Sequence, residues 1–201
     1  FRTLKDYQKA KSCYEKAIEI NPIYVHAHNN LGNVFNKLGE NQKAIGCYQK
    51  AIEINPNYAD AYNNLGNIFR TLKDYQKAKS CYEKAIEINP NYSDAHNNLG
   101  NIFNKLGENQ QAKDCFIKAI EINPNNAESH YNLGIMFVSL GENQKAIDCY
   151  EKVIRINPSY TDAYNNLGII FVSLGETLRA KSCYKKIIEI NPNNADAHNN
   201  L

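Results

Sequence analysis

Residues 59–92 read ADAYNNLGNIFRTLKDYQKAKSCYEKAIEINPNY, and this 34-residue stretch recurs along the chain with small changes. One proline and one cysteine mark each copy, and both recur at an interval of 34 residues. The markers are Pro22, Pro56, Pro90, Pro124, Pro158 and Pro192, and Cys13, Cys47, Cys81, Cys115, Cys149 and Cys183. A fixed period of this length is the signature of a repeat array rather than of a single globular domain.

We divide the 201 residues into 34-residue units and number positions 1 to 34 within each. The full units cover residues 25–58, 59–92, 93–126, 127–160 and 161–194, with partial units at 1–24 and 195–201. The whole chain, 1–201, is predicted to form a single array of these units. It begins at a phenylalanine inside a unit, so we expect it to be a fragment of a longer protein.

Two apolar stripes predict that each unit is a hairpin of two helices. Positions 3, 7, 10, 11 and 14 recur at helical spacing and define the apolar face of a first helix, which we call helix A. Positions 20, 24, 27 and 28 define a second one, helix B. A glycine at position 15 suits the turn, with Lys5 and Lys73 as weaker replacements, and the Asn-Pro pair at positions 31 and 32 ends helix B. The predicted fold class is all-α, a solenoid of stacked antiparallel hairpins.

Composition excludes several classes of partner. The net charge is +2, from 23 basic and 21 acidic residues, which gives no excess positive field for nucleic acid or an anionic membrane. No apolar run approaches the ~20 residues that a membrane span needs. Equivalent cysteines in stacked helices lie ~10 Å apart, too far for a disulfide, and no Cys-x-x-Cys pair indicates zinc. We therefore predict no metal or cofactor, no nucleic-acid or membrane partner, and an intracellular location, cytoplasmic or nuclear.

Asparagine dominates the face of helix A opposite its apolar stripe. Position 6 holds Asn30, Asn64, Asn98, Asn132, Asn166 and Asn200; position 5 holds Asn29, Asn63, Asn97, Asn165 and Asn199; position 9 holds Asn33, Asn67 and Asn101. The sequence has 31 asparagines, yet the body of helix B, positions 18 to 30, has none in any copy. Asparagine is a middling helix former, so its use on helix A is interpreted as costing helicity without a structural gain, in return for a binding role.

A carboxamide both donates and accepts hydrogen bonds, so it can pair with the main chain of an extended peptide without reading its side chains. Neighbouring helices pack ~8–10 Å apart and an extended chain rises ~3.3 Å per residue. One asparagine per unit would then meet the peptide backbone at about every third residue. We predict proteins or peptides in extended conformation as the partners.

The later units change this face from polar to apolar. Positions 9 and 12 become Ile135, Val138, Ile169 and Val172, and Tyr131 replaces asparagine at position 5. Exposed apolar clusters usually mark binding sites. We expect this half to accept hydrophobic side chains while the earlier half holds backbone alone.

The residues at positions 7, 8, 11, 20, 24, 27 and 32, which read L-G, F, A, Y/F, A and P, resemble the tetratricopeptide repeat over the whole chain. The resemblance implies a right-handed superhelix whose A helices line a concave groove. The array is also similar to the repeats of O-linked N-acetylglucosamine transferases, in which an asparagine ladder holds peptides. Substrate recruitment in a larger glycosyltransferase, with its catalytic domain outside this sequence, is therefore an alternative to a free-standing scaffold.

Other functions find less support in the residues. No Ser/His/Asp set, phosphate loop or metal cluster indicates an enzyme, and position 4 histidines and position 23 cysteines are interpreted as packing residues. Recognition of RNA and capture of a free C-terminal carboxylate both require basic side chains in the groove. The basic residues of helix A are offset by acids at position 2, so neither function is favoured. Residues 1–22 repeat residues 69–90, and the two partial units complete one hairpin, so head-to-tail self-association is also predicted.

Overall fold

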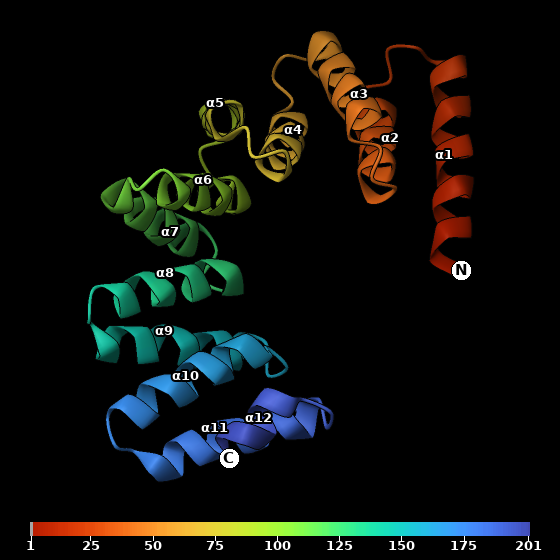
Figure 1. Cartoon of the computed structure of the whole chain (residues 1–201). Coiled ribbons are helices and arrows are strands. Elements are labelled where there is room, and N and C mark those ends of the chain that lie inside the picture. Colours follow the sequence, from red (N-terminus) through yellow and green to blue (C-terminus); the bar gives the residue numbers. More distant parts are fainter. Residues whose placement is uncertain (1) are drawn as a thin grey trace. The chain divides into compact units, whose positions relative to one another are not determined.

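A computed structural model describes residues 2–201, with side chains from residue 6 onward. Twelve α-helices and no strand occur among these residues (Figure 1). The helices are α1 (Arg2–Ile20), α2 (Val25–Lys37), α3 (Asn41–Ile54), α4 (Ala59–Thr71), α5 (Tyr75–Ile88), α6 (Ser93–Lys105), α7 (Asn109–Ile122), α8 (Ala127–Ser139), α9 (Asn143–Ile156), α10 (Thr161–Ser173), α11 (Thr177–Ile190) and α12 (Ala195–Asn200). The predicted all-α fold class is confirmed.

The helices group into two compact units, one up to Ala112 and one from Lys113, with the boundary inside α7. In the first unit α2 packs on α3 and α4 on α5, and α1, α3 and α5 each contact the following helix. In the second unit α8 packs on α9 and α10 on α11, while α9 contacts α10 and α11 contacts α12. Each unit is a run of consecutive hairpins, with α2, α4, α6, α8, α10 and α12 as A helices.

The predicted apolar stripes form the core, with one exception. In the hairpin of α2 and α3, the buried members are Ala27, Leu31, Val34, Phe35, Ala44, Tyr48 and Ala51. Position 14 leaves the core in three copies, where Leu72, Leu140 and Leu174 are 45–55% exposed, while Leu38 and Leu106 are half-buried. Helix A ends at position 13, so this leucine is the C-cap residue and lies at the open tip of the hairpin.

The tip of each hairpin is closed by a left-handed residue. Gly39, Gly107, Gly141 and Gly175 have φ between 72° and 79°, as the sequence predicted, and Lys73 takes the same role at φ 61°. The following amide donates to the carbonyl of position 11, for example Asp74 N to Phe69 O at 2.9 Å. This is the Schellman arrangement, which satisfies the free carbonyls of helix A.

Replacing Lys73 by glycine is expected to stabilise the protein. A left-handed conformation costs a residue with a Cβ about 1–2 kcal/mol, so Lys73→Gly should raise the free energy of unfolding by about 1 kcal/mol. Urea denaturation followed by circular dichroism measures the change. The reciprocal variant Gly107→Lys should lower stability by a similar amount; equal stability of the two variants would contradict the strain at Lys73.

The first helix differs from the prediction. Residues 2–20 form one continuous helix, although the identical sequence at 70–88 forms α4, a turn and α5. The turn expected at Lys5 is therefore absent. In residues 70–88 the left-handed Lys73 forms the turn between α4 and α5, whereas at residues 2–20 the same sequence, rich in strong helix formers, continues as one helix. Head-to-tail association of the two partial units stays a prediction.

Glycine at position 8 allows helix A to approach the aromatic ring of position 24 in the same hairpin. A Cβ added at Gly66 would lie 2.7 Å from Cε1 of Tyr82, and Gly32, Gly134 and Gly168 face their tyrosines in the same way. Tyr82 is fully buried, so its ring has no room to move aside.

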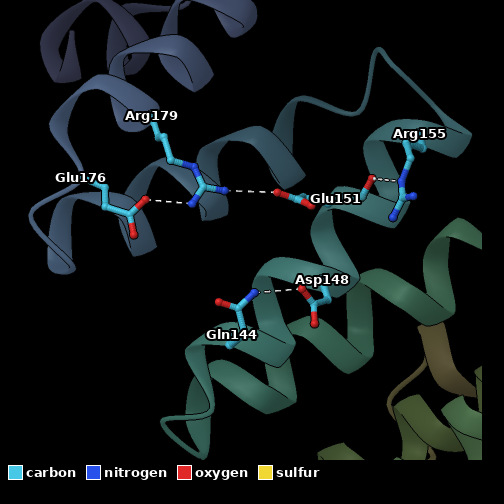
Figure 2. Close-up of polar contacts among 6 residues, drawn as sticks. All are labelled: Gln144, Asp148, Glu151, Arg155, Glu176 and Arg179. Carbon is cyan, nitrogen blue, oxygen red and sulfur yellow. Dashed lines mark hydrogen bonds and ion pairs between the residues drawn. The ribbon is translucent and has the colours of Figure 1, made fainter.

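Charged side chains tie adjacent B helices together in the second unit. Arg179 donates to Glu176 (2.8 Å) and to Glu151 of the preceding B helix (3.2 Å) (Figure 2). Its guanidinium also lies 3.9 Å from the ring centroid of Phe171. The Arg179 side chain thereby covers part of the Phe171 ring at the edge of the core.

Cysteines that are half-buried, or buried in the case of Cys183, predict a loss of stability at alkaline pH. Burial raises the pKa of Cys47, Cys81, Cys149 and Cys183 to about 11. A free thiol titrates near ~8.5, so the unfolded chain releases these protons first as pH rises. The stabilising contribution is complete below about pH 8.5 and is lost as pH approaches 11.

Urea midpoints at pH 7.5, 9 and 10.5 should therefore fall steadily, and a variant with alanine at these four cysteines should show a shallower fall. In a thiol-titration experiment at pH 8, the exposed Cys13 should react first. A midpoint that stays constant up to pH 10.5 would contradict the buried thiols.

Candidate peptide-binding groove

Within each unit, position 6 asparagines of successive A helices are held by hydrogen bonds between hairpins. In the first unit Asn64 Nδ2 donates to Asn29 Oδ1 and Asn98 Nδ2 donates to Asn63 Oδ1, both at 3.0 Å. The partners are 35 residues apart in each case, so position 6 of one hairpin reaches position 5 of the hairpin before it. We call Asn30, Asn64 and Asn98 in the first unit, and Asn132, Asn166 and Asn200 in the second, the position 6 ladder.

In the first unit the asparagines of position 5 are buried, and two of them accept the hydrogen bonds that hold the ladder side chains. Asn29, Asn63 and Asn97 are only 4–7% exposed. The interpretation that asparagine brings helix A no structural gain is therefore wrong for Asn29 and Asn63, because they accept hydrogen bonds that orient the next hairpin. The angular position of asparagine on one helix does not reveal these hydrogen bonds, since each partner lies on the neighbouring A helix. In the second unit Asn165 is half-buried and Asn199 is exposed.

Position 9 has a structural partner as well. Tyr48 donates its hydroxyl proton to Asn33 Oδ1 and Tyr82 to Asn67 Oδ1, each at 2.8 Å. The half-buried Asn101 lies at the same position of α6. The sequence assigned position 24 to the apolar stripe and did not predict this role for the tyrosine hydroxyls. The available signal was the fixed separation of 15 residues between tyrosine and asparagine.

The position 6 carboxamides keep hydrogen-bonding capacity for a ligand. The ladder asparagines up to Asn166 are half-buried, while Asn200 on α12 is exposed. At Asn64 and Asn98 the hydrogen bond to position 5 occupies one amide proton, which leaves the second proton and the carbonyl oxygen. Each side chain is thus fixed in orientation and can still donate to and accept from one further group.

The second unit replaces this polar surface with an apolar one. Tyr131 takes position 5 on α8 and accepts from Asn166 Nδ2 at 3.3 Å, so the link between hairpins is kept. Ile135, Val138, Ile169 and Val172 are 40–60% exposed on α8 and α10. One hollow of about 360 Å³ is lined by five residues that the sequence predicted for the binding face: Tyr131, Ile135, Val138, Asn166 and Ile169. Tyr150 and Ile170, which were not predicted as site residues, complete its lining.

Tyrosines at position 34 engage the acids of position 2. The Tyr92 hydroxyl donates a hydrogen bond to the Asp60 carboxylate, and Tyr160 donates one to Glu128. In the first full hairpin position 2 is a histidine, and His26 Nδ1 lies 3.0 Å from the Tyr58 hydroxyl. Burial, followed by these carboxylates, raises the pKa of Tyr92 and Tyr160. The sequence analysis considered these acids only as a counterweight to the basic residues of helix A, so their hydrogen bonds to position 34 are an addition from the structure.

The histidines at position 4 have a structural role, as predicted. His28, His96, His130 and His198 each place Nε2 2.9–3.1 Å from the carbonyl oxygen of the proline six residues earlier. A carbonyl only accepts, so Nε2 carries the proton. Within residues 2–201, as far as they are described, no group of three or more His, Cys, Asp or Glu side chains could hold a metal ion.

Family models match most of this chain. A TPR repeat model matches residues 1–39, 32–72 and 135–175, and tetratricopeptide repeat models match residues 59–92, 93–126 and 161–194, and residues 115–148. The chain belongs to the tetratricopeptide repeat (TPR) family. The predicted family and the stacked-hairpin fold are thereby confirmed. A search of curated protein sequences finds no match. None of the described TPR helices has the length and hydropathy to cross a membrane.

Solved TPR structures resemble the chain along most of its length. YrrB, described as a TPR protein with an unusual peptide-binding site, is 27% identical, with a TM-score of 0.68 over 92% of this chain and 96% of YrrB. MamA is 28% identical, with a TM-score of 0.71 over 83% of this chain and 97% of MamA. PilF of Pseudomonas aeruginosa, 21% identical with a TM-score of 0.77 over 96% of this chain and 81% of PilF, shows the fold alone.

Proposed function

We propose that this TPR chain is a non-catalytic scaffold, a single array that binds extended peptide segments along the position 6 ladder. The observation that carries the proposal is the geometry of Asn64 and Asn98. Each carboxamide is fixed at 3.0 Å by the hairpin before it and retains one donor and one acceptor. That pair of groups matches the N–H and C=O of an extended main chain.

Spacing supports a main-chain ligand. Ladder asparagines lie on successive A helices, which pack ~8–10 Å apart, so they meet an extended chain at about every third residue. Such a peptide would be held with little dependence on its side chains over the first unit. The peptide-binding site described for YrrB, of similar length and fold, supports binding of the same kind of ligand here.

Charge supports a peptide over a nucleic acid. The first-unit A helices carry Asp60 and Asp94 with Lys37, Arg70 and Lys105, an excess of one cation, and the second-unit A helices carry Glu128, Asp162 and Asp196 without lysine or arginine. Nucleic-acid binding requires several cations that neutralise phosphates. The ladder face lacks that excess of positive charge.

Selection from a library of random dodecapeptides displayed on their own mRNA tests the proposal. The wild-type chain is the immobilised bait, and a variant with alanine at Asn30, Asn64, Asn98 and Asn166 is the comparison. We expect the wild-type chain to enrich peptides that the ladder variant does not retain. Equal retention of the selected peptides by both proteins would overturn the proposal.

A further inference from the structure

The hollow on the A helices of the second unit has the size and lining of a single side-chain pocket. Its lining residues are Tyr131, Ile135, Val138, Tyr150, Asn166, Ile169 and Ile170. Its volume of about 360 Å³ is at the lower end of the ~300–1,000 Å³ that ligand sites span. Ile135, Val138 and Ile169 are 40–53% exposed around it, so their apolar surface is uncovered.

The change at position 9 also alters the polar groups of this pocket. In the first unit the position 24 tyrosine donates to asparagine, as Tyr82 does to Asn67. In the second unit Ile135 offers no acceptor, and Tyr150 instead accepts from Asn166 Nδ2 at 3.2 Å. Tyr131 accepts from the same nitrogen. Both hydroxyl groups therefore use a lone pair here and keep a proton that a ligand carbonyl can accept.

Charge around the pocket is of one sign. The A helices α8, α10 and α12 carry Glu128, Asp162 and Asp196 and no lysine or arginine. Burial raises the pKa of Tyr131, the hydrogen bond from Asn166 opposes this, and the negative charges of Asp162 and Glu128 raise it further, so the field of both carboxylates reaches Tyr131. Tyr131 lies 5.1 Å from Tyr160 between ring centroids, which extends an aromatic surface toward the acids.

We infer that this pocket, hereafter the Ile135 pocket, takes one aliphatic side chain of an extended peptide whose neighbouring residue is lysine or arginine. The apolar wall accepts the aliphatic group, the hydroxyls of Tyr131 and Tyr150 donate to the adjacent peptide carbonyl, and Glu128 and Asp162 attract the cation. The inference rests on the proposed peptide binding and adds a side-chain specificity that the first unit lacks.

The chain itself supplies the test variant. Ile135→Asn with Ile169→Asn restores the residue found at Asn33 and Asn67, and the carboxamide introduced in place of Ile135 can accept the Tyr150 proton as those residues accept theirs. The double variant is therefore expected to fold with at least wild-type stability. Leu178→Asn is the matched control, because Leu178 is 86% exposed on α11 and does not line the pocket.

The measurement is selection of the same random dodecapeptide library on the wild type and these variants, followed by sequencing. The wild type and Leu178→Asn should enrich Leu, Ile, Val or Met beside Lys or Arg, and serine in place of the aliphatic residue should weaken binding at least tenfold. Ile135→Asn with Ile169→Asn should lose the aliphatic preference while still retaining peptides. Glu128→Gln with Asp162→Asn should lose only the basic preference.

Two outcomes separate this inference from the proposed function. The Ile135 pocket alone would be overturned if the ladder retained peptides without an aliphatic preference. The same holds if the aliphatic preference survived in the variant with Ile135→Asn and Ile169→Asn. A wild-type chain that retains no peptide in the library would overturn both.

Discussion

Replacing Asn64, Asn98 and Asn166 together by alanine is expected to weaken binding of a library-selected peptide about 100-fold. Each ladder side chain contributes a hydrogen bond worth about 1 kcal/mol net, and three sites give about 3 kcal/mol. Isothermal titration calorimetry of the synthetic peptide against both proteins measures the loss. Asn57→Ala, in a loop between α3 and α4, serves as a control and should leave affinity unchanged.

The same triple variant is expected to lose stability. Its alanines remove the donors to the buried carbonyl oxygens of Asn29 and Asn63, and an unsatisfied buried acceptor costs about 1–3 kcal/mol. Asn30→Ala separates the loss of affinity from the loss of stability, because Asn30 is not one of the ladder residues that donate to position 5. Its peptide affinity should fall while its free energy of unfolding stays unchanged. Unchanged urea midpoints in the triple variant would contradict a supporting role for position 5.

Two glycine-to-alanine changes are expected to have opposite signs. Gly66→Ala should lower the free energy of unfolding by about 1–3 kcal/mol, because its Cβ would overlap the buried ring of Tyr82. Gly46→Ala should raise it by about 1 kcal/mol, since Gly46 lies inside α3 with open space around it and alanine is the better helix former. Chemical denaturation of both variants measures the pair, and a stabilised Gly66→Ala would contradict the close approach of helix A to position 24.

Much of the fold follows from the 34-residue period, because each hairpin depends mainly on local sequence. The limit of that rule is visible in residues 2–20, which adopt one helix although residues 70–88 carry the same sequence with a turn. The left-handed lysine in the turn is unfavourable in itself. Sequence identity alone therefore could not decide the conformation.

The ladder face could be predicted by angular position, but its internal hydrogen bonds could not. Asn29 and Asn64 lie on different A helices, and their contact depends on the stagger between hairpins. The same holds for Tyr150, whose ring belongs to the core stripe while its hydroxyl reaches the Ile135 pocket. Periodicity assigns a residue to one face, whereas a long side chain can serve two.

An amide-to-ester scan of a library-selected peptide tests most directly whether the ladder holds the main chain. Each ester removes one backbone N–H donor and leaves the side chain in place. Over the first unit, we predict affinity losses of about fivefold at about every third residue, corresponding to about 1 kcal/mol per hydrogen bond, with alanine substitutions at the same residues nearly silent. Affinity that is unchanged by every ester but lost on alanine substitution would contradict main-chain recognition by the ladder.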